Sequence, residues 1–317
     1  MFPNVSGKDT GESYSSESIW PPGHRSGFVA VVGSPNVGKS TLINTLLEHK
    51  LAIVSPKPQT TRHRLLAILT RENAQIIFID TPGLHQPLHL LGQYMVESAS
   101  EALAEADAIL WLVDATHEPT DEDKFVATAL AKADTAPVAL LINKTDAVSG
   151  EVLAERQKQY LALHETAAAF LISAITGKGL DQVLLWLLDN LPEGPRYYPE
   201  DQLTDREERF LAAELVREQA LRHLREEVPH ALAVSVDEFK ERANGAVYIA
   251  ATVYVEKESQ KGIVIGTGGA MLKSISIAAR QEIERLLGRP VYLDLWVKVR
   301  RNWRRDLKQL KELGYRR

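Results

Sequence analysis

Residues 27–41 read GFVAVVGSPNVGKST, and this stretch decides the fold of the first half of the chain. It begins with a short apolar run rich in valine, Gly27–Gly33, which is typical of a strand buried on both faces of a parallel sheet. The loop that follows leads into a stretch with a helical pattern, Ser40–Lys50. A buried strand, a glycine-containing loop and a helix together bind phosphate, because backbone N–H groups and the positive end of the helix dipole converge there.

The loop itself matches the phosphate-binding pattern G-x-x-x-x-G-K-[ST], with the sequence Gly33-Ser-Pro-Asn-Val-Gly38-Lys39-Ser40. Lys39 is expected to reach the β- and γ-phosphates, and the Ser40 hydroxyl is expected to ligate Mg²⁺. A chance match in an ordinary turn is the alternative. The position between a strand and a helix argues against it.

A second motif, Asp80-Thr81-Pro82-Gly83, follows the strand-like run Gln75–Ile79 and reads D-x-x-G. Asp80 would hold Mg²⁺, directly or through water, while the Gly83 N–H would face the γ-phosphate. The next position is Leu84, where Ras-like enzymes place a glutamine that orients the attacking water. A leucine side chain cannot form a hydrogen bond, so we expect slow intrinsic hydrolysis that a partner or a monovalent cation stimulates.

A third motif, Asn143-Lys144-Thr145-Asp146, follows the apolar run Pro137–Ile142 and reads N-K-x-D. The Asp146 carboxylate can accept both N–H groups on the edge of guanine, where adenine offers no matching pair. Because an unpaired buried acceptor is costly, this geometry can discriminate by roughly 10⁴-fold. Ser173-Ala174, after the run Ala169–Ile172, is expected to supply backbone N–H to the guanine carbonyl. The sequence therefore predicts a guanine-nucleotide site and excludes an ATPase.

Two further groups are candidates for controlling this site. Gln59-Thr60-Thr61-Arg62-His63 lies between the first two motifs and could act as a switch segment that ligates Mg²⁺ and senses the γ-phosphate. We favour Thr61 over Thr60 as that ligand; a polar turn before a strand is the alternative. Asn36 could supply an oxygen to a K⁺ ion, or it could only stabilise the loop.

Strand-like and helix-like stretches alternate through this half of the chain. Expected strands, besides residues 27–33, lie at 64–69, 75–79, 108–113, 137–142 and 169–172, and expected helices at 40–50, 90–103, 121–133, 151–164 and 180–188. The strands at 64–69 and 75–79 read as a hairpin. Alternation over about 165 residues predicts an α/β fold with a doubly wound, mostly parallel sheet.

The composition changes at residues 192–204, where prolines and a glycine indicate a linker. We then expect a helix at 205–226, strands at 231–239 and 246–255, a short apolar helical segment that leads through a glycine loop into a helix at 270–287, a strand at 291–299 and a basic helix at 303–313. Asn244-Gly245 is a strong hairpin signal between the first two strands. This order, α-β-β-α-loop-α-β, predicts a smaller α+β domain of the type II KH arrangement.

The glycine loop of that domain is Gly266-Thr267-Gly268-Gly269, which fits the G-x-x-G loop that clamps the backbone of about four nucleotides. Lys261 and Lys273 flank it and could neutralise phosphates. The apolar side chains expected to line the base groove are Ile263, Ile265 and Ile275. A plain helix-capping turn is the alternative for the loop alone.

The charge distribution supports a nucleic-acid contact at this end. The whole chain has a formal charge of −5, yet residues 261–317 hold 14 Lys+Arg against 5 Asp+Glu. In the basic tail 298–317 the aromatic residues Trp303 and Tyr315 are interleaved, with Trp296 just before it, which favours RNA contact. A solvated helix face and an anionic membrane surface are the alternatives. The absence of cysteine excludes disulfides, thiolate zinc sites and cysteine nucleophiles.

Taken together, the motifs G-S-P-N-V-G-K-S-T, Q-T-T-R-H, D-T-P-G-L-H, N-K-T-D, S-A, V-I-G-T-G-G and L-D-L-W-V-K-V resemble the Era family of bacterial GTPases over residues 27–315. The resemblance implies binding and hydrolysis of GTP to GDP with Mg²⁺, and recognition of the 3′ end of small-subunit (16S) rRNA. It also implies a role in 30S ribosomal subunit biogenesis, in the cytoplasm, with possible peripheral contact with the anionic inner membrane. We expect a monomer.

The resemblance also assigns residues. The motifs make Lys39, Thr61, Asp80 and Gly83 the candidate catalytic residues. The implied nucleotide contacts are Gly33, Ser34, Pro35, Asn36, Val37, Gly38, Lys39, Ser40, Thr41, Asp80, Thr81, Pro82, Gly83, Asn143, Lys144, Asp146, Ser173 and Ala174. For RNA the resemblance implies a clamp at Gly266, Thr267, Gly268 and Gly269. The residue patterns themselves add Lys261 and Lys273 as RNA contacts, Ser40, Thr61 and Asp80 as Mg²⁺ ligands, and Asn36 as a candidate K⁺ ligand.

The expected organisation is a disordered polar tail over 1–26, a GTPase domain over 27–191, a linker over 192–204 and a type II KH domain over 205–317. Two rival functions remain open at this point. A tRNA-modification GTPase uses the same asparagine-bearing phosphate loop, but usually carries a C-terminal cysteine that is absent here. A peripheral membrane GTPase would use the basic tail on anionic lipid.

Overall fold

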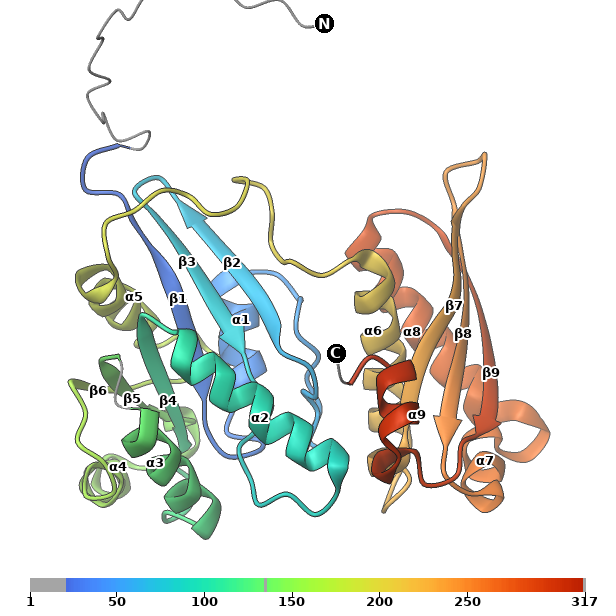
Figure 1. The fold of residues 1–317 in the computed structure, drawn as a ribbon, viewed down its shortest axis with the longest axis horizontal. Coiled ribbons are helices and arrows are strands. Elements are labelled where there is room, and N and C mark those ends of the chain that lie inside the picture. Colours follow the sequence, from blue (N-terminus) through green and yellow to red (C-terminus); the bar gives the residue numbers. More distant parts are fainter. Residues whose placement is uncertain (1–20, 134–135, 316–317) are drawn as a thin grey trace, which may run out of the picture.

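The structure, a computed structural model, describes residues 21–133 and 136–315. These residues form two lobes joined by an extended segment that crosses the top of the first sheet, as Figure 1 shows. The first lobe runs from β1 to α5, and the second lobe runs from α6 to α9.

The first lobe is built on a sheet with the strand order β2-β3-β1-β4-β5-β6. Its strands are β1 (Arg25–Val32), β2 (Leu65–Arg71), β3 (Ala74–Asp80), β4 (Ala108–Asp114), β5 (Val138–Asn143) and β6 (Ala168–Leu171). β2 is antiparallel to β3, and every other pairing is parallel. The predicted hairpin and the mostly parallel sheet are therefore confirmed. Because parallel strands point the same way, β1, β3, β4 and β5 end at one edge.

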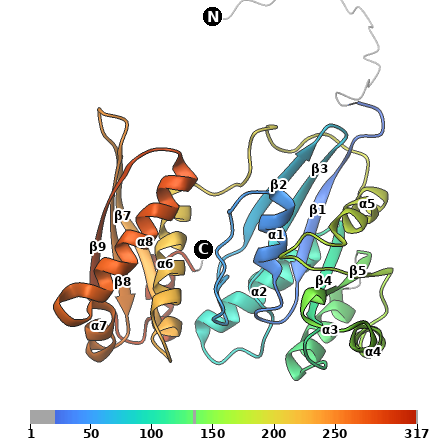
Figure 2. The same ribbon diagram turned by 180° about the vertical axis from the view of Figure 1, so that it is seen from behind.

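Helices cover both faces of this sheet. They are α1 (Lys39–Leu47), α2 (Leu90–Glu105), α3 (Asp121–Ala133), α4 (Gly150–Leu161) and α5 (Leu180–Asn190), with a 3₁₀ turn at Thr145–Ala147. Leu42 of α1 and Leu187 of α5 are buried in the core on one face. Leu103 of α2, Leu130 of α3 and Tyr160 of α4 are buried on the other. Figure 2 shows α1 and α5 in front of the strands, with α2 behind them.

The second lobe has a smaller sheet with the order β7-β8-β9. Its elements are α6 (Glu208–His223), β7 (Ala233–Glu241), β8 (Val247–Val255), α7 (Glu258–Ile265), α8 (Ala270–Leu287), β9 (Val291–Val299) and α9 (Leu307–Glu312), with 3₁₀ turns at Pro229–Ala231, Thr267–Gly269 and Trp303–Arg305. β8 pairs antiparallel with β7 and parallel with β9. Helices α6 and α8 pack on one face of the sheet. The predicted order of elements is confirmed.

The predicted single helix at 303–313 is wrong. The chain forms a 3₁₀ turn at Trp303–Arg305, and α9 begins only at Leu307. Asp306 lies between them in extended backbone, and its side chain accepts a hydrogen bond from the Gln309 N–H at 3.0 Å. An aspartate that caps a new helix cannot continue an old one, because its backbone angles are not helical.

The boundaries of the first lobe also differ from expectation. Most of the predicted tail, residues 1–20, lies outside the described residues, but β1 already begins at Arg25. The expected linker 192–204 is held along the sheet: the Gln75 Oε1 atom accepts from the backbone N–H groups of Tyr197 and Tyr198. No single helix in residues 21–133 and 136–315 has the length and apolar character to cross a membrane; α7 and the bent continuation through α8 pass that test only as a pair.

Candidate nucleotide site and glycine loop

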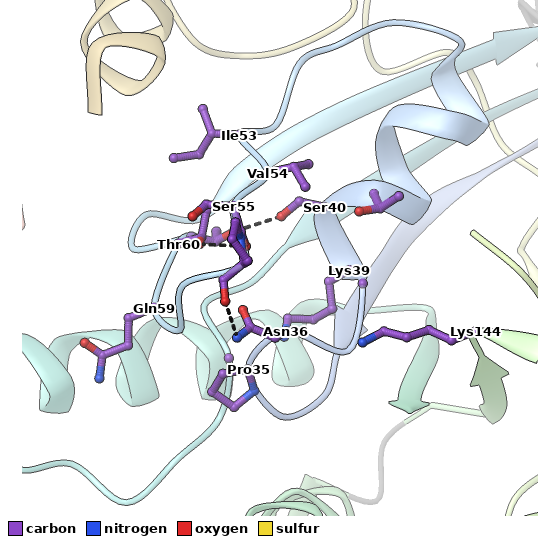
Figure 3. Close-up of a pocket in the computed structure, with 15 residues that line it drawn as sticks. Pro35, Asn36, Lys39, Ser40, Ile53, Val54, Ser55, Gln59, Thr60 and Lys144 are labelled. Atoms are coloured by element: carbon purple, nitrogen blue, oxygen red, sulfur yellow. Dashed lines mark hydrogen bonds between the residues drawn. The ribbon is translucent and has the colours of Figure 1, made fainter. Parts of the chain in front are cut away.

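The predicted nucleotide motifs meet at the edge where the parallel strands end. A pocket of about 370 Å³ lies at this edge, with walls from the loop after β1 and from the segment before β2 (Figure 3). Of the D-x-x-G and N-K-x-D motifs only Gly83 and Lys144 line it, and Asp146, Ser173 and Ala174 are not among its lining residues. The lining residues are Pro35, Asn36, Gly38, Lys39, Ser40, Thr41, Ile53, Val54, Ser55, Pro56, Gln59, Thr60, Thr61, Gly83 and Lys144. The wall formed by residues 53–56 was not predicted, because these residues match no nucleotide motif.

Two positions of the phosphate loop require glycine, because neighbouring atoms lie too close to the backbone there for a Cβ atom to fit. A Cβ atom on Gly33 would clash with the Leu112 carbonyl, and one on Gly38 would clash with the Asn143 Nδ2 atom. Gly38 also has φ +107, a conformation that favours glycine. The phosphate loop therefore packs directly against the asparagine of the guanine motif, so the two motifs form one rigid unit.

Lys39 is buried beneath the loop and donates hydrogen bonds to the carbonyls of Gly33 and Ser34, at 3.0 and 2.9 Å. Burial lowers the pKa of Lys39 to about 8, and the nearby carboxylate of Asp80 opposes this shift. A bound polyphosphate would replace the two carbonyls with charged acceptors and favour the ammonium form.

The three predicted Mg²⁺ ligands lie together. The Ser40 Oγ atom is 2.9 Å from Thr61 Oγ1 and donates to Asp80 Oδ2 at 3.0 Å. Burial raises the pKa of Asp80 to about 6, while Lys39 lowers it. The second oxygen of Asp80, Oδ1, is buried without a hydrogen-bond partner among the described residues. An oxygen cluster with an unpaired carboxylate oxygen fits a hard cation such as Mg²⁺.

Thr60 is placed differently from Thr61. Its hydroxyl donates to the Lys57 carbonyl at 2.6 Å, within its own loop. Of the two, only Thr61 has a hydroxyl that reaches Ser40 and Asp80, the latter at 3.3 Å. The choice of Thr61 as a metal ligand stays a prediction, and this geometry supports it.

The guanine motif is held by contacts within the protein. Asp146 Oδ1 accepts from the Ser173 hydroxyl at 2.6 Å, and Lys144 pairs with Asp114. The Ala174 N–H, which we expected to contact the guanine carbonyl, donates to Asn143 Oδ1 at 2.8 Å. This N–H would have to exchange its partner, or share it, when guanine binds.

The region around Leu84 contains polar contacts that the sequence did not predict. Leu84 is buried, and its N–H donates to the Gly33 carbonyl at 3.2 Å. The Gln59 Nε2 atom lies 3.0 Å from His85 Nε2, which links the switch segment to the residues that follow the D-x-x-G motif. Asn36 donates through Nδ2 to the Pro56 carbonyl at 3.1 Å, so it bridges the phosphate loop and the switch segment.

Sequence reasoning missed the contacts that join the switch segment to the second lobe. Arg217 of α6 donates to the Thr60 carbonyl, and Arg62 donates to the Leu232 carbonyl in the second lobe. Glu218 of α6, which is buried, accepts from the Val54 N–H at 3.1 Å. Thr61 therefore lies between two residues that bind the second lobe. No local signal could reveal these pairs, because their members are more than 150 residues apart.

The predicted glycine loop lies between α7 and α8, with Gly268 and Gly269 at φ +58 and +80. A Cβ atom on either glycine would meet no atom within 4 Å, so the loop faces open space. Lys273 is exposed and Lys261 is partly exposed. The expectation for Ile275 is wrong: it is fully buried in the core of the second lobe, whereas Ile263 is half exposed.

The aromatic residues of the tail are placed differently from one another. Trp303 and Tyr315 are buried, and Tyr315 stacks on His63 of the switch segment with 4.4 Å between ring centroids. Burial lowers the pKa of His63 to about 4, so the stacked ring is neutral. Interpreting Trp303 and Tyr315 as RNA-facing residues is therefore wrong, because they join the lobes. Trp296 is exposed, in contrast to Trp303 and Tyr315.

Comparison with known proteins agrees with this geometry. A family model described as a 50S ribosome-binding GTPase matches residues 28–144, and a KH domain model matches residues 227–304. These matches, with the fold and the site, define the chain as a GTPase that carries a KH domain.

Two solved structures are similar over nearly the whole chain. A crystal structure of Era in complex with MgGDPNP and nucleotides 1506–1542 of 16S ribosomal RNA has 43% identity and a TM-score of 0.89, and covers 92% of this chain and 99% of that chain. A crystal structure of a variant of Aquifex aeolicus Era bound to GDP.AlF4⁻ has 43% identity and a TM-score of 0.88 with the same coverage. The chain belongs to the Era family of GTPases.

Proposed function

We propose that this GTPase is a switch that binds GTP and GDP with Mg²⁺, recognises the 3′ end of 16S rRNA and assists 30S subunit biogenesis in the cytoplasm. Support for the ligands comes from the similar Era structure that holds MgGDPNP and nucleotides of 16S rRNA. Support for the reaction comes from the similar structure that holds GDP.AlF4⁻.

The nucleotide would be held by groups already in place. The phosphate loop offers its N–H groups at the start of α1, and Lys39 lies beneath them to neutralise the β- and γ-phosphates. Ser40, Thr61 and Asp80 would hold Mg²⁺, which supplies charge neutralisation on the phosphates when bound. Asp146 would accept from guanine.

The absence of a hydrogen-bonding side chain at Leu84 supports slow intrinsic hydrolysis. Asn36 is a candidate K⁺ ligand, because it already lies between the phosphate loop and the switch carbonyl of Pro56. A cation at this point would face the phosphates.

The observation that carries the switch proposal is the position of Thr61. Its hydroxyl lies at the metal cluster, while Thr60 and Arg62 on either side bind the second lobe. A change at the γ-phosphate that moves Thr61 would therefore also act on α6 and on the turn at Pro229–Ala231. Coupling of this kind requires that the nucleotide site and the second lobe both shift the equilibrium between two conformations of the switch segment.

The direct test is GTP hydrolysis with and without an oligonucleotide of the 16S rRNA 3′ end, in K⁺ and in Na⁺. We expect a low rate alone, a higher rate with RNA and a higher rate in K⁺ than in Na⁺. Equal rates in all four conditions would contradict both the RNA coupling and the cation proposal. An anionic liposome in place of RNA tests the membrane alternative.

A further inference from the structure

One face of the β7-β8-β9 sheet is only partly covered. Alternate residues of β8 and β9 point into the core with α6 and α8, and the residues between them point to the opposite, outer face. On β9 the outer residues are Tyr292, Asp294, Trp296 and Lys298, and on β8 they are Tyr248, Ala250, Thr252 and Tyr254. The C-terminal segment packs on Tyr254 through Trp303 and Leu310. Leu91 and Met95 of α2 belong to the same cluster, so this face is covered at its Tyr254 end.

The uncovered part contains a trough of about 370 Å³. The small side chains Ala250 and Thr252 belong to its lining, and Trp296 lies opposite Thr252 in the strand register. On the other side, the register shift between Val236 and Glu238 brings two successive carboxylates, Asp237 and Glu238, to the trough. An aromatic wall therefore faces an acidic wall.

The aromatic residues are unusually accessible for their size. Tyr292 is 52% exposed and Trp296 is 47% exposed. Elsewhere on this face the chain already uses an arginine to cover such rings. The Arg242 guanidinium carbon lies 4.6 Å from the ring centroid of Tyr292 and 5.0 Å from that of Tyr248. Trp296 has no such cation among the described residues.

The charges on the face select the kind of ligand. Asp237, Glu238 and Asp294 would repel a phosphate backbone, which argues against RNA. Lys298 also lines the trough, and Glu238, whose side chain is 48% exposed, is paired with Lys240 at 3.0 Å. The Asp237 carboxylate accepts from the Thr252 hydroxyl at 2.7 Å and from the Ser235 hydroxyl at 3.2 Å, and each carboxylate oxygen has a second lone pair for a further donor. Tryptophan, tyrosine and arginine together are the residues that dominate protein–protein interfaces.

We propose that this outer face, defined as Asp237, Glu238, Tyr248, Tyr292 and Trp296, docks a protein segment that inserts an arginine into the trough. The guanidinium stacks on the Trp296 ring and donates to the carboxylates of Asp237 and Glu238. A planar, weakly hydrated guanidinium suits both contacts better than an ammonium group does. The site is separate from the nucleotide pocket and from the glycine loop, so it would serve a further partner.

The test uses the full-length protein and two fluorescein-labelled peptides of equal length and charge, one alternating Arg and Gly and the other alternating Lys and Gly. Binding is measured by fluorescence anisotropy at about 0.15 M salt, where long-range attraction is screened. We expect the arginine peptide to bind at least about threefold tighter than the lysine peptide. Trp296→Ala should weaken the arginine peptide about tenfold and make the two peptides equal.

Glu238→Gln leaves the Trp296 ring in place and should weaken the binding of both peptides. Matched controls are Leu185→Ala, an exposed apolar residue on α5, and Glu165→Gln, an exposed carboxylate, and both should leave binding unchanged. Thermal melting checks that each variant is folded. Equal affinity of all variants for the arginine peptide would overturn the proposal. So would a Trp296→Ala variant that loses affinity for a 16S rRNA oligonucleotide but not for the peptide, because the face would then bind RNA.

Discussion

At the scale of single residues, Thr61 differs from its neighbour Thr60 in the partners of its hydroxyl. Two adjacent threonines have the same chemistry, but only Thr61 directs its hydroxyl to Ser40 and Asp80, whereas Thr60 bonds back to Lys57. The sequence could narrow the metal ligand to a pair. Choosing between Thr60 and Thr61 required the positions of their hydroxyl groups in the structure.

Thr61→Ala should therefore lower the rate of GTP hydrolysis about 10-fold to 100-fold, since it removes an oxygen from the proposed metal site. Thr60→Ala is the matched control and should change the rate less than about threefold. Steady-state phosphate release at saturating GTP and Mg²⁺ measures both. Equal losses in the two variants would contradict the assignment.

Replacing either of two tryptophans in the second lobe should have very different effects on the free energy of unfolding. Trp303 is fully buried, and its Nε1–H donates to the Ala231 carbonyl at 2.9 Å, whereas Trp296 is 47% exposed. Trp303→Ala should lower the free energy of unfolding by about 3–5 kcal/mol, because it leaves a cavity and an unpaired carbonyl. Trp296→Ala should cost roughly 1 kcal/mol or less. Chemical denaturation of both variants tests the prediction, and similar losses would argue against the described burial.

At the scale of elements, the sequence predicted α3, α8 and β9 from end to end. Their hydrophobic patterns are regular. Gly288, which caps the C-terminus of α8 in a left-handed conformation, is a helix-stop signal that can be recognised in the sequence. The final helix was predicted wrongly because Trp303 and Leu310 have helical spacing and are buried in one cluster, yet Asp306 between them has non-helical backbone angles and caps a new helix. The nucleotide motifs could be predicted because each is local in sequence. The contacts of Arg62 and Arg217 could not, because they depend on how the lobes pack.

The glycine loop allows a matched test of RNA binding. Gly268→Asp places a carboxylate where the loop faces open space, so it should weaken binding of a 16S rRNA 3′-end oligonucleotide at least about tenfold while leaving GTP affinity unchanged. Gly245→Asp, in the β7–β8 turn, has a similar positive φ and equal free space. It controls for backbone strain and added charge. Anisotropy of labelled RNA measures both variants, and the proposal fails if they behave alike.

At the scale of the whole molecule, the two lobes share one core at their junction. His63, Tyr94, Trp303 and Tyr315 pack together around the switch segment, and α2 contributes Leu91 and Met95 to the same cluster. Lys50 of the first lobe pairs with Glu218 of α6 at 2.7 Å. The uneven charge of the chain follows the same division, since the basic excess lies at the KH end. The nucleotide site and the KH domain are therefore joined by direct packing and by an ion pair.

The central claim is that the switch segment couples nucleotide state to RNA affinity, and the most direct measurement is the affinity for the 16S rRNA 3′-end oligonucleotide in GDP and in GDPNP. We predict tighter binding in GDPNP for the native protein, by about fivefold or more. In Arg217→Gln, which loses the bond to Thr60, the two affinities should become equal while GDP affinity is retained. An undiminished difference between GDP and GDPNP in Arg217→Gln, or no difference in the native protein, would contradict the account.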